Sequence, residues 1–216
     1  MTSNKPHPPA RAKFLFTGIT LVIALTSATA WILDWTALRP LQNSGGLYFP
    51  FHVEIPGPHF LQADPEWADE NLASTSESLA QSGCAVASAA MVLSARGLEI
   101  DPSSLNAFLT RTPGGYTPNG WIYWEKAPEI DPAVTANFLP HYEDAPSHFL
   151  IDWNLLRGNP IIVRVRYENG ITHFVPIVGK HGFEYLIRDP GEGGKSGTTF
   201  LSSLPPPIEA LRFYKK

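Results

Sequence analysis

The sequence predicts an α+β domain preceded by one apolar helix that is long enough to cross a bilayer. Three observations lead to this fold class. An uncharged, mostly apolar run occupies residues 14–33, and an alanine-rich segment with helical periodicity follows Ser82. Segments rich in β-branched residues, separated by turn residues, lie between residues 160 and 189.

The composition suits one globular domain with a short tail. The chain has 216 residues, of which 44% are hydrophobic and 17% are charged, and its formal net charge is -4. No Lys/Arg-rich run interleaved with aromatic residues occurs, so we expect no nucleic-acid partner. The single cysteine, Cys84, excludes an intrachain disulfide and a zinc site built from several cysteines.

No motif indicates a metal or another cofactor, and we expect none. The HExxH and EF-hand spacings do not occur in the sequence. The segment GEGGKS at residues 191–196 resembles part of a phosphate-binding loop. That motif requires glycine at position 189, where this chain has an aspartate, so we reject it.

The apolar run at residues 14–33 predicts a transmembrane helix, because about 20 apolar residues span the core of a bilayer. The charges around it place residues 1–13 in the cytoplasm and the rest of the chain outside. The basic residues that precede it are Lys5, Arg11 and Lys13. A cleaved signal peptide is the alternative, since Ala28-Thr29-Ala30 matches the cleavage pattern. The apolar run continues to Leu33, which favours an uncleaved anchor.

Residues 34–60 are expected to connect the anchor to a globular domain formed by residues 61–216. The connection contains Gly45-Gly46 and the sequence IPGP, which favour extended pieces over regular structure.

Three helices are expected in the domain. The segment SGCAVASAAMVLSARG has apolar residues three and four apart and closes with Gly97, which predicts a buried helix with Cys84 on its first turn. A second helix begins with Asp101 as its cap and Pro102 in its first turn. A third spans residues 147–157 and ends at Gly158.

Three antiparallel strands are expected in the C-terminal part. Residues 160–167 are rich in β-branched residues and precede Asn169-Gly170, a strong hairpin turn. The chain returns over residues 173–178, turns again at His181-Gly182, and forms a third strand over residues 183–188.

Cys84, His173 and Asp189 are the candidate catalytic residues. A thiol at a helix N-terminus is favoured as thiolate, because the unpaired amides and the helix dipole stabilise negative charge. A nucleophile needs a base within hydrogen-bond reach, and the base needs a third group that orients its ring. Neighbouring antiparallel strands can bring His173 and Asp189 together at one edge of the sheet. Taken singly, the three also suit a core thiol, a strand-end histidine and a turn aspartate.

Four segments between residues 61 and 189 carry a family resemblance: LQADPEWADENL, SGCAVASAAMVLSARG, GGYTPNGWIYWEKA and NPIIVRVRYENGITHFVPIVGKHGFEYLIRDP. Together they resemble the bacteriocin-processing (double-glycine) peptidase-like family of papain-like cysteine peptidases, in its stand-alone extracytoplasmic form. The resemblance implies a papain-like fold, in which a helical half carries the nucleophile and an antiparallel sheet forms the other half. The chain departs from the family after Cys84, where Ala-Val-Ala-Ser replaces the more usual Gly, Pro or Thr.

The resemblance implies that Cys84 is the nucleophile, His173 the base and Asp189 the residue that orients the base. Gln62 would donate to the oxyanion, with Gln81 as the alternative because it lies closer to the cysteine in sequence. The chain would then be a peptidase of the bacterial cytoplasmic membrane, with its catalytic domain outside. It would cleave peptide or protein substrates through a thioester, with acyl transfer as the alternative to hydrolysis. The alternative is a catalytically silent module that binds a peptide or an envelope partner protein.

Three further sets of residues have secondary expectations. The first set is expected to be structural or to line the cleft: Trp67, Gly114, Gly115 and Tyr116. For an aromatic cluster, core packing is favoured over lining a peptide cleft: Trp121, Tyr123 and Trp124. The remaining histidines are expected at the surface or in packing: His52, His59, His141 and His148.

Overall fold

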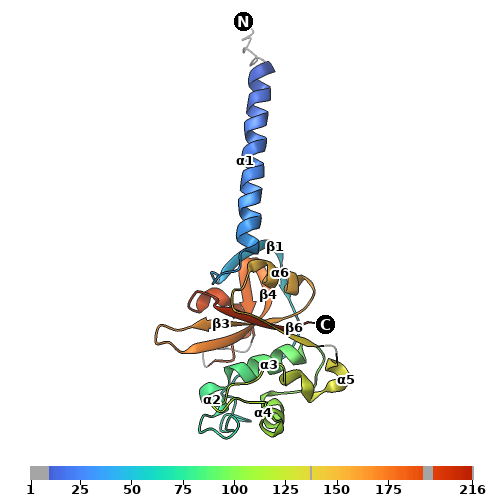
Figure 1. Cartoon of the computed structure of the whole chain (residues 1–216), viewed down its shortest axis with the longest axis vertical. Helices are drawn as coiled ribbons and strands as arrows, with labels where there is room; N and C mark the ends of the chain where they lie inside the picture. The colour runs from blue at the N-terminus through green and yellow to red at the C-terminus, as the bar shows by residue number, and fades with distance from the viewer. Residues whose placement is uncertain (1–9, 137, 192–196, 216) are drawn as a thin grey trace.

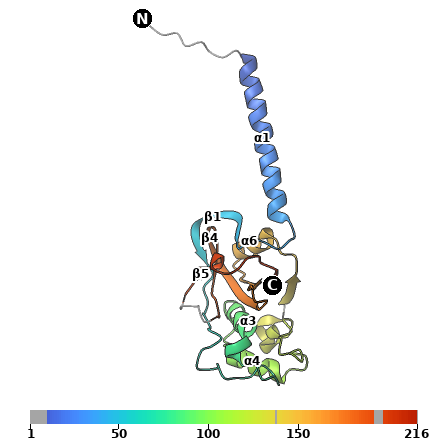
Figure 2. The ribbon, with the colours of Figure 1, turned by 90° about the vertical axis from the view of Figure 1, so that its left-hand side faces the viewer.

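The computed structural model describes residues 10–136, 138–191 and 197–215, and it consists of one long helix followed by an α+β domain (Figure 1). The long helix, α1 (Ala10–Thr36), projects away from the domain in both views (Figures 1 and 2). Its segment Thr17–Thr36 has the length and hydropathy of a membrane span, and none of that span is buried against the domain. The predicted N-terminal apolar helix is therefore present, as a signal sequence or an anchor.

The domain is built on one antiparallel sheet with the strand order β1-β4-β3-β6-β2, with β5 pairing to β4 outside this path. The pairings join strands that are far apart in the sequence, such as β2 with β6. The strands are β1 (Ser44–Glu54), β2 (Leu139–Glu143), β3 (Ile161–Arg166), β4 (Thr172–Ile187), β5 (Thr199–Phe200) and β6 (Ala210–Lys215).

Helices cover both faces of this sheet, and the predicted α+β class is confirmed. In Figures 1 and 2 the sheet lies between α6, next to α1, and a group of helices that includes α3 and α4. The helices are α2 (Leu79–Ser82), α3 (Cys84–Ser94), α4 (Pro102–Arg111), α5 (Pro132–Thr135) and α6 (His148–Leu156), with short 3₁₀ turns at η1 (Ala127–Ile130) and η2 (Leu201–Ser203).

The predicted helix boundaries follow from local capping. Asp101 caps α4 by accepting a hydrogen bond from the amide of Ser104, and Ser147 caps α6 by accepting one from the amide of Leu150. The turn after α3 contains Gly97 with φ 100°, a conformation that glycine adopts readily. All three predicted helices are therefore present.

The alternation of side chains along β3 divides the core in two. Ile162 faces the helical half, where it belongs to one apolar cluster with Leu93 of α3. Its neighbour Val163 faces the opposite way and packs in a second cluster with Ile151 and Leu155 of α6. Burying each such side chain contributes about 1.5–3 kcal/mol. The two clusters fix α3 and α6 on opposite faces of the sheet.

Strand β4 differs from the two separate strands that the sequence predicts. Extended backbone continues from Thr172 to Ile187 without a break, yet the chain doubles back near Gly182, where φ is 60°. The amide of Arg188 donates to the carbonyl of Pro176 at 3.2 Å, so the two halves of the strand lie side by side. The strand continues through the bend because β1 pairs with it there, through Phe49 and Gly182. This edge strand lies within residues 34–60, the segment expected to be a connection.

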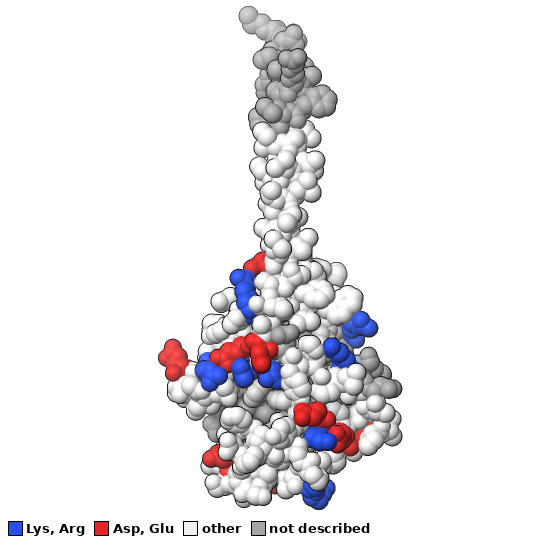
Figure 3. Space-filling model, viewed as in Figure 1, with Lys and Arg blue, Asp and Glu red and all other residues white. Residues whose placement is uncertain are grey.

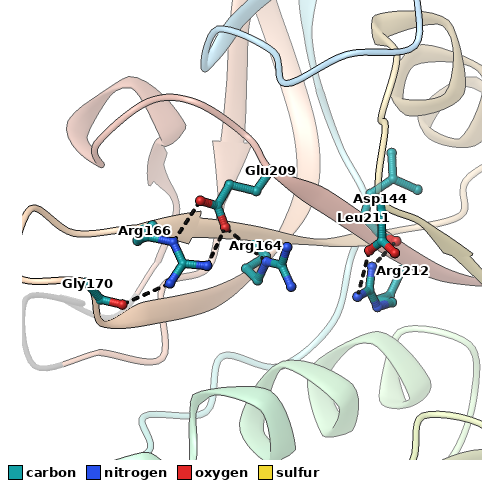
Figure 4. A network of polar contacts seen from close by, with 7 residues as sticks. All are labelled: Asp144, Arg164, Arg166, Gly170, Glu209, Leu211 and Arg212. Carbon is teal, nitrogen blue, oxygen red and sulfur yellow. Dashed lines mark hydrogen bonds and ion pairs between the residues drawn. The ribbon is translucent and has the colours of Figure 1, made fainter.

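Ion pairs brace the hairpin that leads into β4 (Figure 4). The Glu209 carboxylate accepts hydrogen bonds from Arg164 Nε at 3.1 Å and from Arg166 Nε at 2.8 Å. Arg166 also donates to the carbonyl of Gly170 in the turn between β3 and β4, at 3.0 Å. The turn is thus tied to the sheet just before His173.

Candidate active site

Cys84 is the first residue of α3 and is partly exposed. The link from α2 to α3 is tight, because a Cβ atom on Gly83 would lie 2.4 Å from the carbonyl oxygen of Leu79. The helix cap at Gly83 makes no side-chain hydrogen bond. The amides of the first turn therefore remain available to stabilise negative charge beside the Cys84 sulfur.

His173 and Asp189 meet because β4 doubles back. His173 lies near the start of the strand, Asp189 just beyond its end, and His173 Nε2 is 2.7 Å from Asp189 Oδ1. The amide of Gly191 donates to the same carboxylate oxygen at 2.8 Å. His173 is 7% exposed, so water competes little for these hydrogen bonds. The predicted meeting of the two side chains at one edge of the sheet is present in the structure.

The charges around His173 favour its protonated form. Burial alone lowers the pKa of this ring, but hydrogen bonds to Asp189 and to the Cys84 sulfur, together with their negative charges, raise it to about 9. For Asp189, burial raises the pKa, while the His173 ring and the Gly191 amide outweigh burial and lower it. Both shifts favour an imidazolium at His173 paired with the Asp189 carboxylate at neutral pH.

Ser88 ties α3 to β4 at this point. Its hydroxyl, one helical turn beyond Cys84, donates to the carbonyl of Phe174 at 2.9 Å, and Ser88 is fully buried. Because Phe174 follows His173 directly, this bond sets the position of the cysteine relative to the histidine. Sequence reasoning missed Ser88, although a polar residue on the buried face of an alanine-rich helix was the available signal.

Tyr167, which sequence reasoning also missed, covers the histidine from the hairpin. The ring centroids of Tyr167 and His173 lie 5.9 Å apart. Burial, followed by the charges of Asp189 and Cys84, raises the pKa of the Tyr167 phenol. Its ring therefore stays neutral near the site and partly shields the histidine from water.

The structure separates the two candidate glutamines. Gln81 accepts a hydrogen bond from the amide of Ser78 at 2.9 Å and so completes the cap of α2. Gln62 is 8% exposed, and its Nε2 donates to the carbonyl of Ala80 at 2.7 Å, one helical turn before Cys84. The amide of Gln62 donates to the carbonyl of Pro190 at 2.8 Å. Gln62 thus lies between the segment that carries Asp189 and the approach to the cysteine.

The residues expected to be structural or to line the cleft support loops around the helical half. Trp67 Nε1 donates to the carbonyl of Leu61 at 2.8 Å, one residue before Gln62. The hydroxyl of Tyr116 donates to Asn106 of α4 at 2.7 Å. A Cβ atom on Gly115 would lie 2.0 Å from the carbonyl oxygen of Leu109, which requires glycine there.

The expectation of core packing is wrong for two residues of the aromatic cluster. Trp121 is 71% exposed and Tyr123 is 40% exposed, because the buried residue between them, Ile122, takes the inward position. Trp124 is partly buried and contacts Phe174, with ring centroids 5.3 Å apart. Only Trp124 of the three packs against the core beside the site.

One of the remaining histidines lies close to the site. His59 Nε2 is 2.7 Å from the carbonyl oxygen of Asp189, and its Nδ1 accepts from the amide of Gly197 at 3.1 Å. The others behave as expected: His148 is buried beside Tyr185, and His52 is at the surface.

Most of the rejected phosphate-loop segment, residues 192–196, lies outside the described residues. Within the described residues, no group of three or more His, Cys, Asp or Glu could hold a metal ion.

Solved structures with similar folds include two peptidases. One is described as a C39-like peptidase from Bacillus anthracis, with 16% identity and a TM-score of 0.45, covering 77% of this chain and 98% of that one. The other is the peptidase domain of Streptococcus ComA, a bifunctional ABC transporter involved in a quorum-sensing pathway, with 21% identity and a TM-score of 0.42. This second match covers 61% of the present chain and 89% of the ComA peptidase-domain chain. No protein-family model and no curated protein matches the sequence.

Proposed function

We propose that this chain is a membrane-anchored cysteine peptidase that cleaves peptide bonds outside the cytoplasmic membrane. Cys84 is the nucleophile, His173 the acid and base, and Asp189 the residue that orients the histidine. One observation carries the proposal: the His173 ring is hydrogen-bonded to Asp189, and the helix that begins with Cys84 is tied through Ser88 to Phe174, the residue after His173.

The reaction follows from these positions. The Cys84 thiolate attacks the substrate carbonyl, and the resulting oxyanion is stabilised by the first backbone amides of α3 and by the side-chain Nε2 of Gln62. The His173 imidazolium then gives its proton to the leaving amine, which departs and leaves a thioester on Cys84. The neutral His173 next takes a proton from water, and the hydroxide attacks the thioester. Collapse of this second intermediate releases the carboxylic acid and restores the thiolate–imidazolium pair.

The membrane assignment rests on α1 and the charges that flank it. Its apolar span ends at Thr36, where the domain begins, and the basic residues of the N-terminal tail favour a cytoplasmic start. The mass of the protein recovered from membranes distinguishes an anchor from a signal peptide. An intact N-terminus supports the anchor, and a chain that begins at Trp31 overturns it.

The rate at which a thiol-directed electrophile labels the full chain, measured against pH, tests the catalytic assignment. Cys84 is the single cysteine, so each modified molecule reports on this site alone. An ordinary cysteine thiol ionises with a pKa of about 8.5. We expect rapid labelling of Cys84 at pH values well below this. The His173→Ala variant should lose this rapid phase. Labelling that follows an ordinary thiol titration in both proteins would indicate a silent binding module instead.

Peptide hydrolysis is the second readout. We expect Cys84→Ala and His173→Ala each to abolish turnover of a peptide library while the circular dichroism spectrum stays unchanged. Wild-type turnover in either folded variant would remove that residue from the mechanism.

A further inference from the structure

Aromatic rings connect the end of α1 to α6. Trp31 stacks on Trp35 with ring centroids 5.4 Å apart, and Trp35 contacts Phe149 edge-on at 5.1 Å. Phe149 in turn stacks on Trp153, with centroids 6.1 Å apart. The contacts therefore run without interruption from the last turns of the apolar span to the surface of α6.

A buried charge pair holds this junction rigid. Trp35 Nε1 donates to Asp152 Oδ2 at 2.9 Å, and Asp152 Oδ1 accepts from Lys180 Nζ at 2.6 Å. Both charged side chains are fully buried, and Lys180 also donates to the carbonyl of Gly45 at 2.6 Å. Trp35 thus shares the Asp152 carboxylate with Lys180 of β4, and it also contacts Phe149, so a hydrogen bond and a ring contact hold the end of α1 to α6.

The junction places α6 at the membrane surface. Tryptophan residues gather where the hydrocarbon core meets the headgroups, and Trp31 and Trp35 mark the outer end of the apolar span. Trp153, which the same ring contacts reach, is 47% exposed. A large exposed aromatic side chain beside a membrane anchor suits the interface between lipid and water.

A cleft of about 750 Å³ opens beside α6, between the end of α3 and β6. Three aromatic rings line it: Phe149, Trp153 and Phe213. Three basic side chains also line it: Arg96, Arg157 and Lys215. None of the lining residues, all of which belong to the described part of the chain, is acidic. Phe149 both lines the cleft and contacts Trp35, so the cleft is adjacent to the anchor.

The basic side chains differ in how far they are already engaged. Arg96 donates to the carbonyl of Tyr214 at 2.9 Å and also bonds to Asn159, so it forms part of the wall. Arg157 and Lys215 are exposed, and the Arg157 guanidinium lies 5.3 Å above the Trp153 ring. Figure 3 shows basic side chains on the right-hand flank of the domain, with no acidic side chain directly beside them. Two positive charges are therefore presented next to an apolar wall.

We propose that this cleft binds the headgroup of an anionic phospholipid from the leaflet that surrounds α1. Arg157 and Lys215 bind the phosphate, and the aromatic rings pack against the glycerol and the first methylene groups of the acyl chains. The volume lies within the range of small-molecule sites, about 300–1,000 Å³. The proposal rests on α1 being a membrane anchor, and it is independent of catalysis at Cys84.

Native mass spectrometry of the delipidated full chain in detergent tests this site. We add phosphatidylglycerol and phosphatidylcholine of different masses in equal amounts, and we expect phosphatidylglycerol to dominate the first bound lipid. Neutralising Arg157 or Lys215, as Arg157→Gln and Lys215→Gln, should reduce the preference about five-fold for each residue. The matched control is Arg111→Gln, which removes an exposed arginine from α4 at the opposite end of the domain. That control should leave the preference unchanged.

Three outcomes would overturn the proposal. Equal binding of the two lipids would show that charge is not recognised, and a preference retained in the doubly neutralised variant would place the lipid elsewhere. Displacement of phosphatidylglycerol by inorganic phosphate alone would assign the cleft to a free anion. Labelling of Cys84, measured on the same preparations, reports separately on the peptidase proposal.

Discussion

Asp189, just beyond the end of β4, is hydrogen-bonded to the ring of His173, which lies near the start of the same strand. The contact between His173 Nε2 and Asp189 Oδ1, at 2.7 Å, exists because β4 reverses its direction at Gly182. Sixteen residues separate the two side chains in sequence. The contact between His173 and Asp189 therefore depends on the bend in β4, and the edge strand β1 pairs across that bend.

Replacing Asp189 by asparagine should move the alkaline limit of peptide hydrolysis. The negative charge of Asp189 raises the pKa of His173, which reaches about 9, so its loss should lower that pKa. The imidazolium that protonates the leaving amine would then be lost at a lower pH. Hydrolysis should persist at a reduced rate, unlike in Cys84→Ala, because both the nucleophile and the histidine are still present. The pH dependence of kcat/KM measures the shift, and an unchanged alkaline limit would contradict the role of Asp189.

The same raised pKa predicts a pH-dependent contribution to stability. The His173 pKa is about 9 in the folded chain, against about 6.5 in an unfolded one, so folding favours the protonated ring. This contribution is fully present below about pH 6.5 and is lost as the pH rises through about 9. It amounts to on the order of 3 kcal/mol. Denaturant unfolding of wild type and His173→Gln, near pH 6 and near pH 10, isolates it. The stability gap between the two proteins should narrow at the higher pH.

Removing the hydroxyl of Ser88 should affect catalysis more than stability. Ser88→Ala leaves the carbonyl of Phe174 without its partner and costs about 1–3 kcal/mol. It also releases the constraint between Cys84 and His173, so kcat should fall. Ser94→Ala is the matched control, because Ser94 makes an equivalent bond from the same helix to the carbonyl of Ile100 at 2.9 Å, away from the site. A similar loss of kcat in both variants would mean that Ser88 acts through stability alone.

The two glutamines should separate catalysis from capping. Gln62→Ala should lower kcat about 100-fold, the effect of removing one oxyanion donor, while Cys84 labelling stays fast. Gln81→Ala should cost about 1 kcal/mol of stability through the lost cap of α2 and leave kcat unchanged. Steady-state kinetics and thermal unfolding of both variants provide the comparison. The reverse pattern would assign the oxyanion role to Gln81.

The features that the sequence predicts well are those encoded locally. The caps at Asp101 and Ser147 mark helix starts within a few residues, and Asn169-Gly170 marks the hairpin turn that precedes β4. Cys84 is recognisable at the start of its helix because Gly83 and the alanine-rich run adjoin it. Each of these signals depends on neighbouring residues alone, so no knowledge of tertiary packing is required to find it.

The features that the sequence does not predict depend on pairing across long separations. Strand β1 contains Gly45-Gly46 and a proline, and it becomes a strand because β4 supplies its hydrogen-bonding partner. The short strands β2 and β6 pair with each other although they are far apart in the sequence. The choice between Gln62 and Gln81 similarly depends on a contact with Ala80 that sequence proximity does not reveal.

The rigid junction at Trp35, Asp152 and Lys180 has a geometric consequence for substrate choice. With α1 in the membrane, α3 lies beyond the sheet, on the far side of the domain from the bilayer (Figure 1). Cys84 would then work at a constant height above the lipid surface. A membrane-bound substrate would be cut only where its chain extends far enough to reach that height. The distance between the membrane and Cys84 would thus select substrates by the length of chain that projects from the lipid surface.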